Sequence, residues 1–427
     1  MRKIVIDGER LDRELRELAG FTQVEHSPMG TAVTRVVFTP DDLAARVWLK
    51  GLAEEAGFAV RVDGVGNTFI RWEGREAGLA AIATGSHIDA IPHAGMYDGT
   101  VGVLGGLEAM RALKASGFEP KRSIELVLLT SEEPTRFGIG CLGSRLMAGT
   151  LSAERADGLV DLLPGAEVGT TLATVRAEAG FTGSLATVKL APGHYEGWVE
   201  LHIEQGPLLE REGLPIGMVT DIAAPAGYRF VVEGVGGHAG ALLMPDRRDA
   251  LCAAAELILS VERHVLKANA DSGTSNTVGT VGTCEVHPGA VNSVPSRVTL
   301  QLDIRDTDPE RREGVMRAVR ADSAEIMATR GVTIAESLVN ADAPATSSPK
   351  IVAAIEAACR EAGLPFKKMV SRAYHDSLFM ARICPIAMIF IPCRGGVSHR
   401  PDEYASISAI VNGTRILASA LATLAKD

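Results

Sequence analysis

The sequence is poor in aromatic residues and has no excess of positive charge, and each shortage excludes a class of protein. Aromatic residues make up 4% of the 427 residues and hydrophobic residues 46%, which predicts a core of mainly aliphatic side chains. The formal net charge is −10. Because nucleic acids and anionic membranes bind basic surfaces, neither is expected as a partner. An acidic surface is otherwise ordinary for a cytoplasmic enzyme.

Several motifs are also missing. The six cysteines are scattered without a C-x-x-C pair, which predicts reduced thiols in a cytoplasmic protein and not a thiolate metal site. The first residues, MRKIVIDGERLDRELREL, run into a charged amphipathic helix without the apolar segment of a signal peptide. No stretch is expected to reach the roughly 18 apolar residues that span a bilayer. The chain also lacks the G-x-S-x-G motif of one large class of serine hydrolases.

From residue 39 onward the pattern alternates between helix and strand. Thr39 and Pro40 form a helix cap that predicts a helix to about Gly57. A second helix is predicted over 98–116, and the predicted strands are 58–63, 67–72, 79–86, 123–130, 198–204 and 385–392. Alternating strands and helices are typical of an α/β fold with a mostly parallel, covered sheet.

The segment 224–341 has a different pattern. It predicts strands at 228–235, 276–286, 297–306 and 332–339, with helices at 246–267 and about 309–330. In the 297–306 strand, Val298, Leu300, Leu302 and Ile304 alternate with polar residues, so that one face is predicted to be buried. The order β-α-β-β-α-β is that of a ferredoxin-like unit. We therefore predict a first domain of residues 1–223 and 342–427, with 224–341 as an inserted second domain.

Four short segments carry residues that can bind a metal ion. These are GSHIDAIPHAGMYDG at 85–99, TSEEPTRFG at 130–138, ELHIEQGP at 200–207 and GGVSHRPDEY at 395–404. Each segment is weak evidence by itself, since a single strand histidine is more often a core residue and a pair of glutamates is more often solvated. The carboxyl ends of strands in an α/β sheet converge on one crevice, however, so four distant segments can form one site. Their histidines and carboxylates are suited to zinc, manganese or cobalt.

Together the four segments resemble the dinuclear amidohydrolases related to aminoacylase and carboxypeptidase-type metallopeptidases. Within them the chain is similar to the branch of N-carbamoyl-L-amino-acid, allantoate and ureidoglycolate amidohydrolases. The resemblance implies a homodimer and two divalent metal ions per subunit, with Mn²⁺ favoured over Zn²⁺, Co²⁺ or Ni²⁺. The metal ligands that it implies are His87, Asp98 as the bridge, Glu133, His202 and His399.

The same resemblance implies roles for the neighbouring residues. Glu132 is expected to act as the general base, and Asp89 to orient the ring of His87. His238, in GGHAG, is expected to stabilise the oxyanion from the inserted domain, which serves as lid and dimerisation domain. Without the resemblance, His238 would be interpreted as a turn residue.

Five residues are expected to contact the substrate. Arg305 lies on the polar face of the 297–306 strand and suits a bidentate carboxylate contact, although pairing with Asp303 or Asp306 is the alternative. The other four are Gln205, Asn292, Tyr374 and His375. The implied dimer has sites shared between subunits.

The segment SRAYHDSLFMAR at 371–382 distinguishes members of the branch. It is similar to plant ureidoglycolate amidohydrolases, as are IAAPA at 222–226 and MIFIPC at 388–393, whereas the other members usually have GAGHDA where this chain has RAYHDS. Tyr374 replaces a glycine and favours a short substrate. The resemblance implies hydrolysis of a small ureido acid, (S)-ureidoglycolate, to glyoxylate, ammonia and CO₂. The alternatives are an N-carbamoyl-L-amino-acid or allantoate amidohydrolase, and a metal-free binding protein of the same fold, which would require lost ligands.

Overall fold

The computed structural model describes residues 3–25, 32–76 and 78–426, which form two compact units. Unit 1 comprises Met1–Thr220, Thr346–Met369 and His375–Asp427, and unit 2 comprises Asp221–Ala345 and Val370–Tyr374. The predicted insertion 224–341 falls inside unit 2. The short segment Val370–Tyr374, which includes Tyr374, was expected in the first domain and instead belongs to unit 2.

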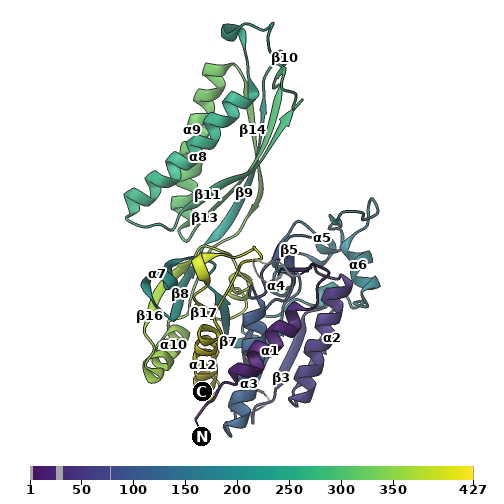
Figure 1. Cartoon of the computed structure of the whole chain (residues 1–427), viewed down its shortest axis with the longest axis vertical. Helices are drawn as coiled ribbons and strands as arrows, with labels where there is room; N and C mark the ends of the chain where they lie inside the picture. The colour runs from purple at the N-terminus through teal and green to yellow at the C-terminus, as the bar shows by residue number, and fades with distance from the viewer. Residues whose placement is uncertain (1–2, 26–31, 77, 427) are drawn as a thin grey trace. The chain divides into compact units, whose positions relative to one another are not determined.

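Unit 1 is built around a nine-stranded sheet of mixed direction (Figure 1). Its central strands, in the order β17-β7-β4-β6, are parallel to one another. The pairs β8–β17, β3–β6 and β2–β3 are antiparallel, so the expectation of a mostly parallel sheet holds only for the centre. The strands are β2 Ala59–Val62, β3 Thr68–Trp72, β4 Ala81–Ser86, β6 Ile124–Leu128, β7 Tyr195–Ile203, β8 Ile216–Ile222, β15 Ala345–Thr346, β16 Phe366–Ser371 and β17 Ile386–Ile391.

The central strands are mainly apolar, and their few polar residues, such as Ser86 and Glu125, are buried with them. Every residue of β4, β6 and β17 is buried. The longer helices of the unit pack against the sheet and one another around an aliphatic core. They are α1 Gly8–Ala19, α2 Pro40–Glu55, α3 Thr100–Ala115, α10 Pro349–Ala362 and α12 Ile407–Leu424; shorter elements are β1 Val33–Arg35, β5 Ala90–Ala94, α4 Leu142–Ala148, α5 Ala153–Asp157, α6 Leu172–Glu178, α7 Leu208–Glu212 and α11 Ser377–Met380.

Helix α12 corrects one expectation from the sequence. It is 18 residues long with a mean hydropathy of 1.4, so by length and composition it could cross a membrane. Of that stretch, 61% is buried inside the protein, where α12 packs against α3, α10 and β7. A buried core helix passes the same test, so α12 is weak evidence for a membrane span.

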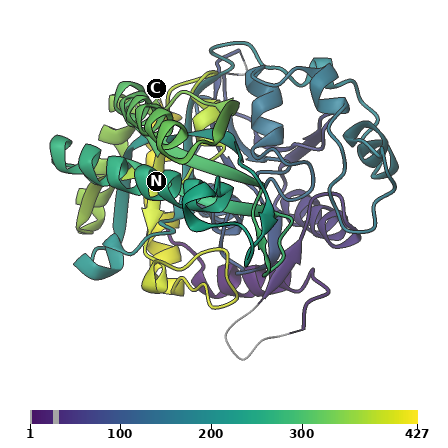
Figure 2. The same cartoon turned by 90° about the horizontal axis from the view of Figure 1, so that it is seen from above.

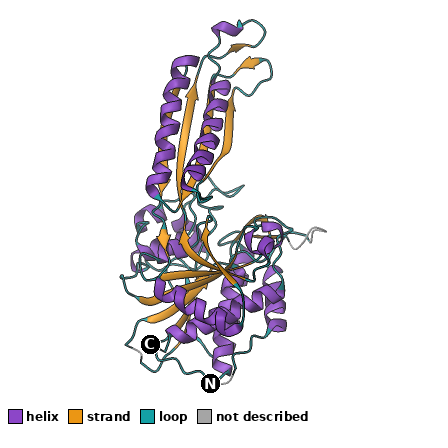
Figure 3. Ribbon diagram, turned by 90° about the vertical axis from the view of Figure 1, so that its left-hand side faces the viewer, coloured by secondary structure: helices purple, strands orange, loops and turns teal. Residues whose placement is uncertain are grey.

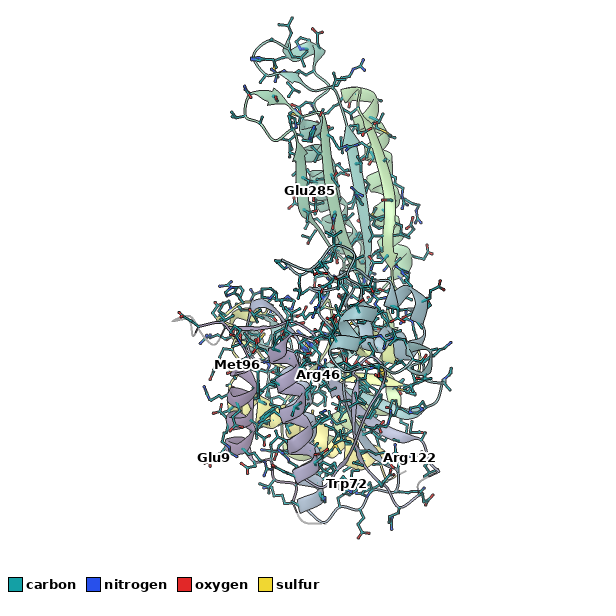
Figure 4. All side chains as sticks on the ribbon, turned by 90° about the vertical axis from the view of Figure 1, so that its right-hand side faces the viewer. Glu9, Arg46, Trp72, Met96, Arg122 and Glu285 are labelled. Carbon is teal, nitrogen blue, oxygen red and sulfur yellow. The ribbon has the colours of Figure 1, made fainter. Side chains whose placement is uncertain are left out.

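Buried polar contacts connect α2 to the loops that precede β3 and follow β6. Arg46, labelled in Figure 4, is 3% exposed and pairs with Asp42 at 2.8 Å. Its Nη1 donates to the carbonyl oxygen of Gly66 and to the hydroxyl of Thr130. Because Thr130 is the second residue after β6, these contacts fix the start of the loop that carries Glu132 and Glu133.

Unit 2 is a four-stranded antiparallel sheet with two long helices. The chain order is β9 (Ala224–Glu233), α8 (Ala250–Ser272), β11 (Val278–His287), β13 (Arg297–Asp306), α9 (Pro309–Arg330) and β14 (Thr333–Ala341), and the strand order is β11-β13-β9-β14. Figure 3 shows α8 and α9 side by side along the sheet, and Figure 2 shows the same pair from above.

The core of unit 2 lies between these helices and the sheet. Val298, Leu300, Leu302 and Ile304 of β13 are all buried in it, as the alternation in the sequence predicts. On α8, the residues Ala254, Leu257, Val261 and Val265 are buried, but Leu251 is 37% exposed. Leu251 lies in the first turn of α8.

Candidate metal centre

Four segments that are distant in sequence meet at one edge of the unit 1 sheet. His87 follows β4, Glu132 and Glu133 follow β6, His202 lies near the end of β7, and His399 lies in the loop after β17. These four strands are neighbours and run parallel. Their carboxyl ends therefore open on the same side, as expected for sites in α/β sheets.

Asp98 is at the centre of this cluster. Its Oδ1 lies 3.2 Å from His202 Nε2 and 3.5 Å from His87 Nε2. Its Oδ2 lies 3.3 Å from His399 Nε2, and the same nitrogen lies 3.2 Å from Glu133 Oε1. The two oxygens of one carboxylate thus face two different groups of side chains. All five residues predicted as metal ligands lie together.

The cluster divides into two sets of possible metal ligands that share Asp98. One set is His87, Asp98 and His202, and the other is Asp98, Glu133 and His399, with the ligand atoms of each set within 4.8 Å of one another. Imidazole nitrogens and carboxylate oxygens are ligands for borderline and hard divalent cations. The donors of this chain therefore fit a pair of cations bridged by Asp98.

The charges in the cluster are strongly coupled. Burial by itself would lower the pKa of His87, but Glu132, Asp98 and Asp89 raise it well above the ordinary value. Hydrogen bonds to Asp98 and Glu133 raise the pKa of His399 to about 11. Burial would raise the pKa of Asp98, but its three histidine partners hold it well below the usual range. The carboxylates of the cluster therefore favour the protonated form of His87 and His399, and the histidines favour the ionised form of Asp98.

A close approach of two loops needs glycine beside Asp98. Gly99 has a φ of 66°, in the left-handed region that glycine adopts without strain. A Cβ at this position would lie 2.5 Å from His87 Nε2. Any larger residue at position 99 would push His87 away from Asp98.

Asp89 contacts His87 in a different way from the one expected. His87 Nδ1 lies 3.0 Å from the backbone carbonyl oxygen of Asp89, whereas the nearest carboxylate oxygen is at 3.8 Å. The carboxylate of Asp89 instead accepts hydrogen bonds from the backbone amides of Glu132 and Glu133, at 3.2 and 3.0 Å. Asp89 thus orients the ring through its main chain and holds the Glu132–Glu133 turn through its side chain.

Glu132 lies beside both sets of possible ligands. It is 8% exposed, and its Oε2 lies 3.8 Å from His87 Nε2. Burial raises the pKa of Glu132 well above the ordinary value, and the nearby charges of Glu133, Asp376 and Asp98 act in the same direction. The thiol of Cys141, at 3.6 Å from Glu132 Oε1, donates a weak hydrogen bond to it. A carboxylate with a raised pKa is suited to accept and return a proton near neutral pH.

Gln205 contacts the bridging carboxylate, which the sequence did not predict. Its side-chain nitrogen donates to Asp98 Oδ2 at 2.5 Å and lies 3.4 Å from the Ser398 hydroxyl. The residue has a φ of 55°, so the backbone turns sharply after β7 and directs the amide at Asp98. Gln205 therefore contacts Asp98 within the site, and its contact with substrate stays a prediction.

His375 and Asp376 lie behind the cluster, at the start of α11. The His375 ring centroid lies 4.4 Å from that of His202. Asp376 accepts a hydrogen bond from Ser144 at 2.5 Å, and burial followed by the charge of Glu200 raises its pKa to about 7. Glu200, two residues before His202, accepts hydrogen bonds from Ser86 and Ser377. The buried roles of Asp376 and Glu200 were not predicted from the sequence.

Two further residues of the His399 loop were also missed. Glu403 is 4% exposed and accepts hydrogen bonds from the backbone amides of Tyr97 and Asp98. The Ser398 hydroxyl lies 2.6 Å from Asp98 Oδ2 and 2.8 Å from Glu403 Oε2. Burial and the charge of Asp98 raise the pKa of Glu403 to about 7. Both residues lie within GGVSHRPDEY, but an acidic residue in a polar loop gives no sign of burial in the sequence.

The remaining predicted residues belong to unit 2. His238 forms the two-residue strand β10 (Gly237–His238), which pairs with β12 (Ser293–Val294) next to Asn292. The amide of Ala239 donates to the Asn292 carbonyl at 2.9 Å, so His238 and Asn292 are neighbours, and both are exposed. The alternative interpretation of His238 as a turn residue is close to its position, since the turn begins immediately after it, and its role toward an oxyanion stays a prediction.

Arg305 and Tyr374 are also neighbours within unit 2. The Arg305 guanidinium lies 5.3 Å from the Tyr374 ring centroid. It also pairs with both carboxylate oxygens of Asp303, at 2.7 and 3.1 Å, which is the pairing weighed as the alternative to substrate binding. Asp306 pairs instead with Arg311.

Comparison with known proteins identifies the class. The profile of Peptidase family M20/M25/M40 matches residues 83–423. The chain belongs to this family of dinuclear metal hydrolases and is itself a hydrolase of the amidohydrolase type. The α/β fold with mixed sheets described above is the fold of the family.

Within the family, the chain is similar to ureidoglycolate hydrolases. It is 52% identical to the ureidoglycolate hydrolase of Oryza sativa subsp. japonica over 98% of this chain and 85% of that protein. The crystal structure of AtUAH in complex with glyoxylate is 49% identical, with a TM-score of 0.87 over 99% of both chains. The N-carbamoyl-L-amino acid amidohydrolase of Geobacillus stearothermophilus is more distant, at 37% identity over 97% of both chains.

Proposed function

We propose that this chain hydrolyses (S)-ureidoglycolate with a pair of divalent cations bound by His87, Asp98, Glu133, His202 and His399. The observation that carries the proposal is the carboxylate of Asp98, whose two oxygens face two separate sets of ligands beside a buried glutamate. The overall reaction consumes one water and yields glyoxylate, two molecules of ammonia and CO₂.

The cations provide one part of the chemistry. When bound, the two cations would polarise the ureido carbonyl oxygen and lower the pKa of the attacking water. Mn²⁺ is the proposed metal, with Zn²⁺, Co²⁺ or Ni²⁺ as alternatives. Two of the five ligands are carboxylates and three are imidazoles, a mixture that suits Mn²⁺ as well as the later metals.

Glu132 provides the proton transfer. Its buried carboxylate takes a proton from the water that attacks the ureido carbonyl carbon and then gives this proton to the departing nitrogen. The buried Glu132 lies 3.8 Å from His87 Nε2, so its carboxylate lies beside the ligands where it can take and return this proton. The amides of Glu132 and Glu133, both held by Asp89, keep the base and the neighbouring ligand in a fixed relation.

Unit 2 provides the remaining groups in this proposal. His238 donates a hydrogen bond to the oxyanion that develops on the carbonyl oxygen, and Arg305 binds the substrate carboxylate with Asn292 nearby. Unit 2 acts as a ferredoxin-like lid and dimerisation domain, so that His238 and Asn292 serve the site of the partner subunit. The enzyme is proposed to be a cytoplasmic homodimer that binds neither nucleic acid nor membrane.

The substrate follows from similarity and from one side chain. Two relatives that are 52% and 50% identical to this chain are named ureidoglycolate hydrolase, and one related structure is described in complex with glyoxylate. Tyr374 packs its ring under the Arg305 guanidinium. A bulky residue beside the carboxylate-binding arginine favours a short acid such as ureidoglycolate over a carbamoyl amino acid with a long side chain.

The proposal is tested with a substrate panel on the Mn²⁺-loaded protein. Release of ammonia is measured with (S)-ureidoglycolate, allantoate and a series of N-carbamoyl-L-amino acids, and glyoxylate is measured separately. The highest kcat/KM is expected for (S)-ureidoglycolate, and removal of the cations with a chelator is expected to abolish the activity. A higher kcat/KM with allantoate or a carbamoyl amino acid would replace the proposed substrate by that alternative.

A further inference from the structure

The strongest unassigned feature near the site is the buried carboxylate of Glu403. It lies in the loop between His399 and α12 and is 4% exposed. Its Oε1 accepts two hydrogen bonds from consecutive backbone amides, Tyr97 at 2.9 Å and Asp98 at 3.1 Å. A single carboxylate oxygen therefore fixes the backbone of the turn that carries the bridging aspartate.

The second oxygen of Glu403 reaches Asp98 by another route. Glu403 Oε2 lies 2.8 Å from the hydroxyl of Ser398, and this hydroxyl lies 2.6 Å from Asp98 Oδ2. Ser398 immediately precedes His399. Glu403 thus connects the main chain of Asp98, the side chain of Asp98 and the residue next to His399.

Packing at Gly95 is independent evidence that this contact is close. A Cβ at position 95 would collide with Glu403 Cβ and would lie 2.5 Å from Glu403 Oε1. Only glycine leaves room for the Glu403 side chain against the main chain just before Met96. The contact therefore involves both the polar end and the apolar stem of Glu403.

We propose that Glu403 is a positioning residue that holds Asp98 and the His399 loop at the spacing required by the cation bound between Asp98, Glu133 and His399. The other set of ligands has firmer support from the sheet, because His87 and His202 follow or lie on central strands and are 3% and 1% exposed. His399 lies on a loop and its side chain is 46% exposed. Loss of Glu403 should therefore weaken one cation more than the other.

The inference rests on the proposed dinuclear function, and its test counts metal ions without any substrate. Cation-free protein is titrated with Mn²⁺, and bound ions are followed by calorimetry and by the electron paramagnetic resonance signal of coupled Mn²⁺ pairs. Glu403→Ala is expected to keep one tight ion and to bind the second about 10–100-fold more weakly, as is usual when a residue supporting a ligand is lost. The signal of the coupled pair should disappear at equal loading.

Two variants test the hydrogen bonds directly. Glu403→Gln keeps an oxygen for the Tyr97 and Asp98 amides and offers an NH₂ group to Ser398, so it should restore most of the affinity for the second ion. Gly95→Ala leaves Glu403 in the sequence but displaces it, so it should lower the affinity for the second ion like Glu403→Ala. If Glu403→Ala does not fold, Gly95→Ala and Ser398→Ala carry the test.

The matched control is Glu108, a fully buried glutamate of α3. Its Oε1 accepts the backbone amide of Asp7 at 2.8 Å, and its Oε2 pairs with Arg10. Glu108→Ala is expected to lower the melting temperature while both Mn²⁺ ions bind as in the parent protein. If Glu108→Ala weakens the second ion as much as Glu403→Ala, or if Glu403→Ala binds both ions with unchanged affinity, the inference is wrong. If the parent protein itself binds no pair of ions, the proposed function fails instead.

Discussion

The side chain of Asp89 holds the backbone of Glu133, with 3.0 Å between Asp89 Oδ2 and the Glu133 amide nitrogen. Its other oxygen accepts the amide of Glu132 at 3.2 Å. Asp89→Asn replaces one acceptor by a donor that faces an N–H group. We expect the variant to lose about 10–100-fold in Mn²⁺ affinity or kcat, as other residues that support metal ligands do.

Asp308 is the matched control for Asp89. Its Oδ1 accepts two neighbouring backbone amides, those of Glu310 and Arg311, at the start of α9 in unit 2. Because asparagine also caps helices well, Asp308→Asn should leave the metal affinity and kcat close to those of the parent. Equal effects of the two substitutions would show that the Asp89 contact has no particular role at the site.

The adjacent glutamates should respond differently to the same substitution. Glu132→Gln removes the proposed base but no proposed metal ligand, so kcat should fall by about 10²–10⁴-fold while both ions stay bound. Glu133→Gln removes one of the ligands and should weaken the second ion. Metal content is measured by mass spectrometry and turnover by ammonia release. A Glu132→Gln enzyme with nearly normal kcat would contradict the role of Glu132.

Metal binding should release protons. The carboxylates around them raise the pKa of His87, His202 and His399, the last to about 11, so protons compete with a cation for these rings. A cation binds only neutral imidazole, so it must displace these protons, and its affinity should increase as the pH rises above 6.5. Calorimetry in buffers of different ionisation enthalpy measures the released protons. Affinity independent of pH would contradict the prediction.

The same pKa shifts should make the cation-free protein less stable as the pH rises, whereas metal affinity should increase. Since the pKa values of these histidines are higher in the folded state, their stabilising effect is fully present below about pH 6.5. It is lost as the pH rises through the folded-state values towards about 11. The melting temperature of the cation-free protein should therefore fall over this range, and saturating Mn²⁺ should reduce the fall.

Tyr374 should determine the choice of substrate. Tyr374→Gly removes the ring that lies 5.3 Å from the Arg305 guanidinium. A cation–π contact of about 0.5–2 kcal/mol corresponds to a loss of about 2–30-fold in kcat/KM for ureidoglycolate. Activity on N-carbamoyl amino acids should increase relative to ureidoglycolate. Tyr374→Phe keeps the ring and separates the effect of the hydroxyl. An unchanged preference in Tyr374→Gly would remove this residue from the pocket.

Mixing of subunits tests the proposed shared site. Glu132→Ala and His238→Ala subunits are each expected to be inactive alone. If His238 serves the site of the partner, one of the two sites in a mixed dimer has both residues intact. About half of the activity per mixed dimer should then return, or about a quarter for an equal mixture after complete exchange. Exchange is monitored with differently tagged subunits. Complete exchange without recovery would mean that His238 acts within its own chain.

The sequence predicts best those features that depend on local patterns. The strand 297–306 agrees with β13 at both ends, because strict alternation of Val298, Leu300, Leu302 and Ile304 leaves one possible buried face. The residues around Asp98 were predicted from the resemblance to a known family, because each of the four segments is weak evidence by itself. The convergence of neighbouring parallel strands at one edge of the sheet accounts for their lying together. The apolar length of α12 was not recognised, because small and polar residues such as Asn412 and Thr414 interrupt it.

Other features depend on contacts between distant segments and leave no local pattern. The antiparallel pairing of β3 with β6 and of β8 with β17 depends on the topology of the chain, and the spacing of apolar residues in these strands does not indicate it. Glu403 and Asp98 are 305 residues apart, and the contact of Gln205 with Asp98 spans 107. No composition or spacing within GGVSHRPDEY indicates that its glutamate is buried and its serine bridges two carboxylates.

The position of β17 in the sheet has a consequence for biosynthesis. β17 lies between β8 and β7, although β7 ends at Ile203 and β17 begins only at Ile386. The intervening residues 221–345 can assemble their own sheet and helices while the ribosome is still at work, since domains commonly fold as units during translation. The sheet of unit 1 cannot be completed until β17 (Ile386–Ile391), which lies between β8 and β7, has been synthesised. A nascent polypeptide released before that point would expose apolar strand edges and would depend on chaperones.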